Sequence, residues 1–310
     1  MDKIAIILPA YNESLTIKET ILSFYNELPE AQIVVIDNNS SDDTSKITNE
    51  TFKQYNINGT LLFEKRQGKG NAVRYAFKQI KADIYVMADA DMTYPASAVH
   101  QLIEPIQNEH CDMVVGDRHS AGDYKKENKR AFHNLGNNLV KTMVNKLFHS
   151  NISDIMSGYR AFSHRFVKNY PILVEGFELE TDMTLHALDK RFNIKEISIS
   201  YKDRPEGSYS KLSTFNDGAK VIFTIIQIFR YYRPLFFFGL LSLFFAILSL
   251  ISAIPVFDDW FRYQYIYHVP LAILATGLGL ISIIFISLGI TLDAIVHQHK
   301  IEFEQKVMQD

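Results

Sequence analysis

The sequence predicts an α/β domain with a mostly parallel sheet, followed by two helices that could cross a membrane. From residue 3 to residue 116, short apolar runs alternate with segments of helical spacing, which is typical of a parallel sheet. From residue 234 to residue 292, the only charged residues are Asp258, Asp259 and Arg262. Two predicted strands end in acidic residues, at Asp37 and Asp89, and such strand ends are where α/β sheets bind ligands.

The strands are expected at 3–8, 32–37, 61–64, 84–89 and 111–116, and the helices at 13–28, from 42 onward and at 70–80. The apolar periodicity places each boundary, since buried strands read as short β-branched runs. The carboxyl ends of parallel strands meet at one edge of a sheet. The polar residues expected at that edge are Tyr11, Glu13, Asp37, Asn38, Asp89, Asp91 and Arg118.

The composition excludes several classes of protein. The chain has 310 residues and a formal net charge of −3, which gives no electrostatic case for binding nucleic acid. Its one cysteine, Cys111, cannot form an internal disulfide and suits a reducing compartment. The apolar run near the N-terminus, Ile4 to Leu8, is too short for a secretory signal.

Two uncharged stretches, 235–257 and 269–292, each exceed the roughly 20 residues that cross a hydrocarbon core. A buried core helix is the alternative, but two adjacent charge-free runs are unusual in soluble domains. The connector, 258–268, carries Trp260 and four other aromatic residues. Basic residues flank the outer ends of the two stretches, so the positive-inside rule predicts that both termini are cytoplasmic. No ionisable residue lies mid-span, so nothing indicates an ion path.

The segment before the first span, 213–233, has an apolar face with Ile222, Ile226 and Phe229 and a polar face with Lys220 and Arg230. This pattern favours a helix that lies in the membrane interface, although a helix packed on the soluble domain has the same pattern. The expected organisation is therefore a soluble domain over 1–212, an interfacial helix over 213–233 and a membrane hairpin over 234–310.

The segment Asp89-Ala90-Asp91 directly follows an apolar strand. Mg²⁺ usually takes one or two carboxylates together with substrate phosphates, and the small Ala90 lets a diphosphate approach. Taken alone, this spacing is equally typical of a solvated acidic turn.

Three further segments favour the metal and diphosphate site over the solvated turn. They are Leu8-Pro9-Ala10-Tyr11-Asn12-Glu13, then Val35 to Thr44 with Asp37 at a strand end, and then Gly68-Lys69-Gly70. Asp37 could accept hydrogen bonds from a base or a ribose. The glycines permit close backbone approach, and Lys69 or the helix after it could meet phosphate, although such a segment is often a plain turn.

In this order, the segments resemble family 2 glycosyltransferases with the GT-A fold, over about residues 3–212. The resemblance implies that Pro9, Tyr11, Glu13, Asp37 and Lys69 help to hold a nucleotide. It also implies that Asp89 and Asp91, with Ala90 between them, hold Mg²⁺ or Mn²⁺ on the diphosphate. Asn38 departs from the pattern, since the family often has a second Asp there, so its contact with the base is less certain.

The second half resembles the polyprenyl-phosphate glycosyltransferases related to dolichyl-phosphate mannose synthase. The segments that carry this resemblance are Val115–Arg118, Ser153–Phe162, Gly176–Asp182 and Arg204–Lys211, followed by the apolar stretches. Thr93 departs from it, since some of those synthases have a Gln that completes the metal shell.

This resemblance implies inverting transfer of a hexose or N-acetylhexosamine from a nucleotide diphosphate sugar to a polyprenyl monophosphate, such as undecaprenyl phosphate. A UDP-sugar is favoured as donor. The reaction is expected at the cytoplasmic membrane face, and the lipid-linked monosaccharide is expected to serve modification of cell-envelope glycans.

An acceptor phosphate is already anionic near neutral pH, since its second pKa is about 6, so no strong base is required. The site needs cations instead, and arginine forks match phosphate oxygens. The expected acceptor-phosphate residues are Arg118, Arg130, Asn134, Arg204 and Lys211. Arg130 reads equally as a solvated charge in an exposed loop.

Three acidic residues, Glu178, Glu180 and Asp182, are expected at the donor sugar, although an acidic first helical turn is favoured by the helix dipole alone. Whether Asp182 acts as a base or only binds stays open. The expected catalytic set is Asp89, Asp91, Arg118 and Asp182.

Two other functions also remain open. A glycan-extending transferase that uses a sugar hydroxyl would need a true base near Asp182. A lipid-carrier flippase or a membrane scaffold would need no catalysis, but the intact Asp89-Ala90-Asp91 segment argues against it. A homo-oligomer formed through the membrane helices is compatible with the sequence.

Overall fold

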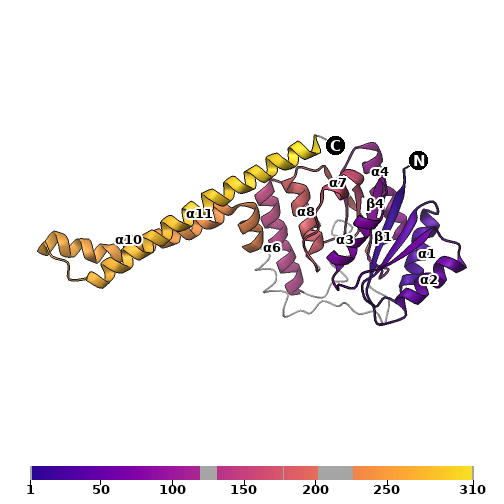
Figure 1. Ribbon diagram of the computed structural model, residues 1–310, viewed down its shortest axis with the longest axis horizontal. Coiled ribbons are helices and arrows are strands. Elements are labelled where there is room, and N and C mark those ends of the chain that lie inside the picture. Colours follow the sequence, from indigo (N-terminus) through magenta and orange to yellow (C-terminus); the bar gives the residue numbers. More distant parts are fainter. Residues whose placement is uncertain (1, 119–130, 177, 202–225, 309–310) are drawn as a thin grey trace. The chain divides into compact units, whose positions relative to one another are not determined.

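The computed structural model describes residues 2–118, 131–176, 178–201 and 226–308. The chain divides into two compact units, Met1–Thr214 and Phe215–Asp310. The first holds a sheet between helices, and the second holds two long helices (Figure 1).

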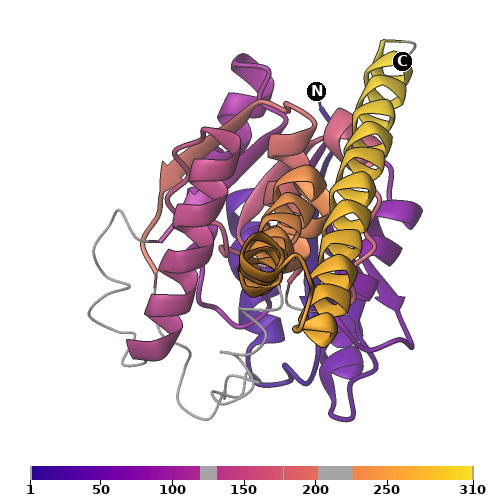
Figure 2. The ribbon, with the colours of Figure 1, turned by 90° about the vertical axis from the view of Figure 1, so that its left-hand side faces the viewer.

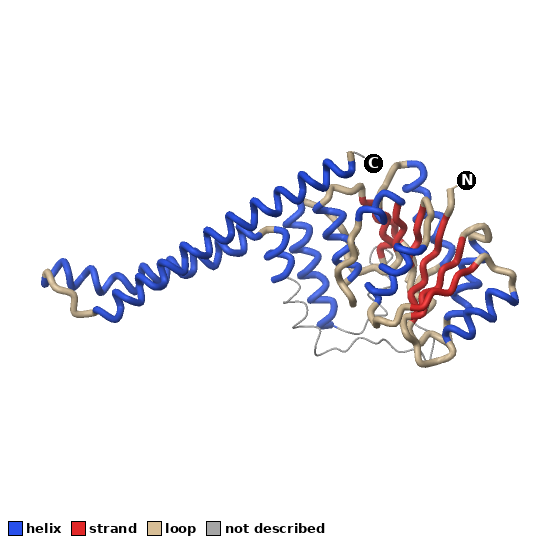
Figure 3. The backbone as a smooth tube through the Cα atoms, in the orientation of Figure 1, coloured by secondary structure: helices blue, strands red, loops and turns tan. Residues whose placement is uncertain are grey.

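A seven-stranded sheet forms the centre of the first unit, in the order β3-β2-β1-β4-β6-β5-β7 (Figure 3). The strands are β1 (Ile4–Ala10), β2 (Gln32–Asp37), β3 (Gly59–Phe63), β4 (Ile84–Met87), β5 (Met113–Asp117), β6 (Arg160–Ser163) and β7 (Ile194–Ser198). All neighbours are parallel except β6, which runs antiparallel to β4 and β5. This confirms the mostly parallel α/β sheet that the sequence predicts.

Side chains alternate between the two faces of each strand, so each face carries its own apolar layer. On one face, Val86 joins a cluster with Ile21 of α1 (Ile17–Glu27) and Leu102 of α4 (Val99–Asn108). On the other face, Tyr85 meets the ring of Phe77 of α3 (Lys69–Gln79). Helices therefore cover both faces.

The reversed strand β6 brings a loop to the functional edge. Its first residue, Arg160, pairs with Met87 and Val115, which lie at the carboxyl ends of β4 and β5. The segment that precedes β6 must therefore lie at that edge. The remaining helices of this unit are α2 (Thr44–Gln54), the short 3₁₀ helix η1 (Ala96–Ala98), α6 (Ala131–Phe148), α7 (His164–Asn169) and α8 (Leu179–Asp189).

The second unit contains α10 (Pro234–Tyr263) and α11 (Val269–Val307), which run side by side in both ribbon views (Figures 1 and 2). They are antiparallel, because Ser242 hydrogen-bonds Ser282 while Ser249 donates to the carbonyl of Ala275. Both helices are long and apolar enough to cross a membrane.

The helices extend beyond the apolar stretches on which the sequence prediction rests. α10 continues to Tyr263, so the first part of the expected connector is helical, and α11 continues to Val307. No proline or glycine interrupts 256–263 or 290–307, so neither segment holds a strong helix breaker. Of the expected interfacial helix, residues 226–232 are helical, and 213–225 lie outside the described residues.

Candidate active site

The Asp89-Ala90-Asp91 segment follows β4 at the carboxyl edge of the sheet. The carbonyl of Ala90 accepts hydrogen bonds from the hydroxyls of Thr16 and Thr20, at 2.8 and 3.2 Å, which fix this turn to the start of α1. Asp91 is buried, and its Oδ1 accepts from the backbone N–H and the hydroxyl of Thr93. Thr93 thus orients Asp91, whatever else contacts that carboxylate.

Lys69, the first residue of α3, joins two carboxylates from distant parts of the chain. Its Nζ pairs with Asp89 and lies 2.5 Å from Oε1 of Glu180 on α8. Burial favours the neutral amine, but the charges of Asp89 and Glu180 outweigh it and raise the pKa of Lys69. The side chain is therefore an ammonium ion.

Hydrogen bonds also tie the ends of the first three strands together. Asn12, after β1, accepts from the N–H of Ser41. Asn38, after β2, donates to the carbonyls of Glu64 and Arg66 and accepts from the N–H of Gly68. The Asn38 amide therefore builds the segment that leads to Lys69.

The other residues expected at the nucleotide lie along the same edge. Pro9 pairs with β2 near the end of β1, and the N–H of Glu13 donates to the hydroxyl of Thr44. Asp37 is buried and accepts from the N–H of Ser40 and from the hydroxyl of Ser45. Tyr11, which lies between Pro9 and Glu13 in the sequence, is partly buried.

The glycines around Lys69 allow another part of the backbone to approach closely. A Cβ added at Gly70 would lie 2.1 Å from the carbonyl oxygen of Val174, and one at Gly68 would lie 2.1 Å from that of Glu175. The N–H of Gly70 also donates to Glu175. The close partner of this turn is therefore the backbone of residues 174–175, and the expected contact of Lys69 or its helix with phosphate stays a prediction.

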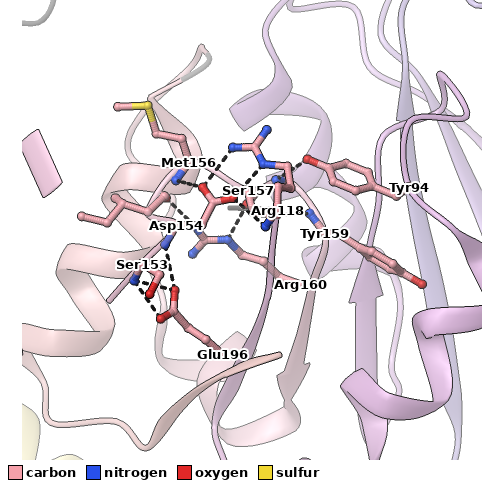
Figure 4. Close-up of polar contacts among 11 residues, drawn as sticks. Tyr94, Arg118, Ser153, Asp154, Met156, Ser157, Tyr159, Arg160 and Glu196 are labelled. Atoms are coloured by element: carbon pink, nitrogen blue, oxygen red, sulfur yellow. Dashed lines mark hydrogen bonds and ion pairs between the residues drawn. The ribbon is translucent and has the colours of Figure 1, made fainter. Parts of the chain in front are cut away.

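A network of buried charges holds the loop Ser153–Gly158 (Figure 4). Arg118 donates from Nε and Nη2 to the two oxygens of Asp154, at 2.7 and 3.0 Å. Glu196 of β7 accepts from the N–H groups of Ser153 and Asp154. Arg160 donates to the carbonyls of Ile155 and Ser157. This loop is thus held by side chains of β6 and β7 and by Arg118, which follows β5.

The end of this loop contacts the Asp89 and Lys69 pair. The N–H of Gly158 donates to the hydroxyl of Tyr94. A Cβ at Gly158 would lie 2.8 Å from Oδ2 of Asp89 and 2.9 Å from Nζ of Lys69. Burial raises the pKa of Tyr94, which stays a neutral hydrogen-bonding group. Gly158 therefore leaves the space that the ion pair fills.

The three acidic residues expected at the donor sugar lie in different surroundings. Glu180 reaches Lys69, whereas Asp182 accepts from the hydroxyl of Tyr170 at 2.7 Å. Two residues on a helix lie about 200° apart, so these carboxylates point in different directions. Burial raises the pKa of Asp182, and the Tyr170 bond partly offsets this. Glu178 accepts from the N–H of Gly176.

Four expected acceptor-phosphate residues cannot be placed with side chains. Arg130, Arg204 and Lys211 lie outside the described residues, and Asn134 lies on α6, whose first side chains are not described. Arg118 is buried, pairs with Asp154, and its guanidinium lies 5.7 Å from the ring centre of Tyr201.

The residues present fit a divalent cation that shares its shell with substrate. Asp89 and Asp91 are hard oxygen donors, and the Asp89 side chain is 30% exposed. Within the described ranges, no three His, Cys, Asp or Glu side chains converge on one point. Two carboxylates with substrate phosphates are the ligands that Mg²⁺ usually takes.

Sequence reasoning missed the residues that hold this site in shape. Thr16 and Glu196 carry no motif of their own, and Glu196 is the one acidic residue of β7. Asp154 and Arg160 do lie in the quoted Ser153–Phe162 segment. Their spacing could have indicated a charged loop, but only the reversed β6 brings them together with Arg118.

Comparison with solved structures agrees with this architecture. The *Mycobacterium tuberculosis* glucosyl-3-phosphoglycerate synthase, in complex with Mn²⁺, UDP and phosphoglyceric acid, is similar with a TM-score of 0.57 and 19% identity. The match covers 74% of this chain and 78% of that one. It shows the GT-A fold.

Sequence comparison gives the family. The glycosyltransferase AglJ of Haloferax volcanii is 27% identical over 300 residues, which cover 96% of this chain and 95% of that protein. The dolichol-phosphate mannosyltransferase of Pyrococcus furiosus is 28% identical over 215 residues, which cover 68% of this chain and 59% of that protein. The model of glycosyl transferase family 2 matches residues 5–170, more than half of the chain. The chain therefore belongs to glycosyl transferase family 2 and is a glycosyltransferase with the GT-A fold.

Proposed function

We propose that this protein transfers a hexose or N-acetylhexosamine from a UDP-sugar to a polyprenyl monophosphate at the cytoplasmic face of a membrane. The proposal rests on one observation: the same chain holds the charged cluster of Lys69, Asp89 and Glu180 and also two long apolar helices. The first suits a nucleotide diphosphate sugar, and the second suits a lipid acceptor.

The donor half of the proposal rests on the ends of β1, β2 and β4. Pro9, Tyr11, Glu13, Asp37 and Asn38 lie at the ends of β1 and β2 or just after them, and they are the proposed nucleotide contacts. The UDP and Mn²⁺ of the M. tuberculosis complex support a uridine donor and a divalent cation on this fold. When bound at Asp89 and Asp91, Mg²⁺ or Mn²⁺ would stabilise the charge of the leaving diphosphate.

The residues of the chain then have separate roles. Lys69 supplies a buried positive charge beside the diphosphate site, and Glu180 is placed for a sugar hydroxyl. Asp91 is held in one orientation by Thr93, so it needs little reorganisation. The network around Asp154 keeps Gly158 against Asp89, which fixes one wall of the site.

The acceptor half rests on the charge of a phosphate and on the membrane helices. A phosphomonoester has a second pKa of about 6, so its oxygen is an anionic nucleophile without a strong base. The relative from P. furiosus, a dolichol-phosphate mannosyltransferase by name, supports a lipid phosphate. Arg118, Arg130, Asn134, Arg204 and Lys211 are the proposed cationic and polar contacts, and Asp182 is proposed to bind the donor.

The membrane arrangement is part of the proposal. The spans are α10 and the apolar part of α11, up to about residue 292, with both termini cytoplasmic. A polyprenyl phosphate keeps its chain in the bilayer and its phosphate at the surface, so the enzyme must be held at that plane. The product would then be a lipid-linked monosaccharide for cell-envelope glycans.

The experiment is transfer of radiolabelled sugar to lipid. Full-length protein in detergent or vesicles is given undecaprenyl phosphate, Mn²⁺ or Mg²⁺ and each of a panel of UDP- and GDP-sugars, and the label is counted after lipid extraction. We expect one UDP-sugar to label the lipid. If none of the donors labels the lipid while a glycan acceptor becomes labelled, the result would contradict the proposal and favour the glycan-extending alternative.

The matched variants are Asp91→Ala and Asp83→Ala, which remove an acid from opposite ends of the β4 region. Asp91→Ala is expected to lower the rate about 100-fold or more, the scale on which transition-state charge stabilisation acts. Asp83 is exposed and its carboxylate accepts from the N–H of Lys3, so its loss should leave the rate unchanged. Full activity of Asp91→Ala would exclude the proposed metal site.

A further inference from the structure

The cluster at Lys69 has more negative than positive charge. Asp89 and Glu180 supply two carboxylates, and within the part of the chain that the structure describes Lys69 is the only cation paired with Asp89. The side chains of Lys69 and Glu180 are 10% and 7% exposed, so water screens this charge poorly. The imbalance favours a further cation.

Asp89 is, however, already in contact with a cation. Its carboxylate contacts the Lys69 ammonium, and the ends of both side chains fill the space that residue 158 leaves by lacking a Cβ. A divalent cation on Asp89 and the ammonium beside it would repel each other strongly in such a buried place. One of the two must give way.

Glu180 offers the ammonium a second partner. Its Oε1 lies 2.5 Å from Lys69 Nζ, so Lys69 can leave Asp89 and stay paired. Glu180 comes from α8 (Leu179–Asp189), and its own contact with Lys69 joins that helix to the start of α3. The second partner is therefore already in contact with the ammonium.

We propose that Lys69 is a built-in counterion that competes with the divalent cation for Asp89, and that Glu180 is the positioning residue that takes the ammonium over. The proposal deepens the proposed function and rests on its assignment of Asp89 as a metal ligand. It makes the free protein a weak binder of the cation alone. A nucleotide diphosphate, which attracts both positive charges, would then strengthen cation binding.

The test is Mn²⁺ binding to full-length protein without donor or acceptor, measured by the free Mn²⁺ signal in electron paramagnetic resonance. Lys69→Met is expected to tighten Mn²⁺ binding at least about tenfold, because the competing charge is gone. The same variant is expected to weaken UDP binding in saturating Mn²⁺ by about tenfold or more, because the ammonium is lost to the diphosphate. The two effects have opposite signs.

The matched control is Lys195→Met. Lys195 also pairs with a carboxylate at 2.5 Å, that of Glu109, but on the partly exposed strand β7. This variant changes the net charge equally and should leave Mn²⁺ binding at the wild-type level. If both lysine variants shift it alike, or if Lys69→Met leaves it unchanged or weaker, the proposal is overturned. The same holds if neither wild type nor Lys69→Met binds Mn²⁺.

Glu180 is tested by a double-mutant cycle. If Glu180 acts through Lys69, Glu180→Gln weakens Mn²⁺ binding in the wild-type background and does so much less in the Lys69→Met background. Equal effects in both backgrounds would show that Glu180 acts only through its own charge. A failure of sugar transfer with the Mn²⁺ results intact would count against the proposed function and leave this inference standing.

Discussion

At the scale of single residues, burial and partners decide what each charged group can do. Glu180 and Asp182 are two positions apart on α8, yet one meets an ammonium and the other meets the hydroxyl of Tyr170. Burial raises the pKa of Asp182, so it is a poorer anion than an exposed aspartate. A sequence motif names both acids and cannot assign these roles.

His186, on the same helix, gives a prediction about pH and stability. Burial among the rings of Phe166, Tyr170 and Phe192, with the charge of Lys190 nearby, lowers its pKa from 6.5 to about 4. Below pH 6.5 the unfolded chain therefore takes up a proton that the folded chain does not. Stability is present above pH 6.5 and is lost as the pH falls toward 4, by about 2 kcal/mol between about pH 7.5 and pH 5.

The measurement is thermal or denaturant unfolding of full-length protein over that pH range. His186→Phe keeps a ring in the cluster and should remove most of the loss. His149→Asn is the control, because His149 is exposed and its left-handed backbone suits asparagine. An unchanged pH profile in His186→Phe would rule out His186 as the cause.

At the scale of elements, two glycines show how loops are joined to the site. Gly70 lies against a backbone carbonyl of residue 174, whereas Gly158 lies against the ends of the Asp89 and Lys69 side chains. A backbone group cannot move away without moving its loop, but a side-chain end can. The two positions therefore respond differently to the same added methyl group.

We expect Gly70→Ala to lower the free energy of unfolding by about 1–3 kcal/mol, as overpacking does. Gly158→Ala should change it by less, and should instead weaken Mn²⁺ and UDP binding, because the methyl group displaces the proposed metal ligand Asp89. Unfolding curves and binding titrations on both variants separate the two effects. Gly239→Ala is the control, since nothing lies within 4 Å of that Cβ. A larger loss of unfolding free energy in Gly158→Ala than in Gly70→Ala would contradict this account.

The elements also show what the sequence can and cannot predict. The expected strands at 3–8, 32–37 and 84–89 agree with β1, β2 and β4 within a few residues, because buried runs between helices are unambiguous. The convergence of Asn38, Asp89 and Asp91 on one edge follows from parallel order alone. The reversed β6 and the partner of Gly70 do not, since they depend on contacts between residues about 70 to 105 positions apart.

At the scale of the whole molecule, the chain joins two units of different chemistry. Residues 1–214 have a core of their own around the sheet, and 215–310 have a hairpin whose interior holds Ser242, Ser282 and Gly289. Most large side chains of the hairpin point outward and are exposed, as in a helix pair that lies in lipid. The proposed catalytic groups and the two helices apolar enough to cross a membrane thus lie in different units.

This separation predicts the effect of removing the second unit. A protein of residues 1–214 is expected to fold, because its core is complete, and to bind Mn²⁺ and UDP as the full chain does. It should transfer sugar to undecaprenyl phosphate in vesicles far more slowly, since it loses the high local concentration that a tether gives. A short, water-soluble polyprenyl phosphate should restore much of its rate, because that acceptor does not need to be met at a membrane. Equal rates of both proteins on vesicles would show that the helices have no part in reaching the lipid.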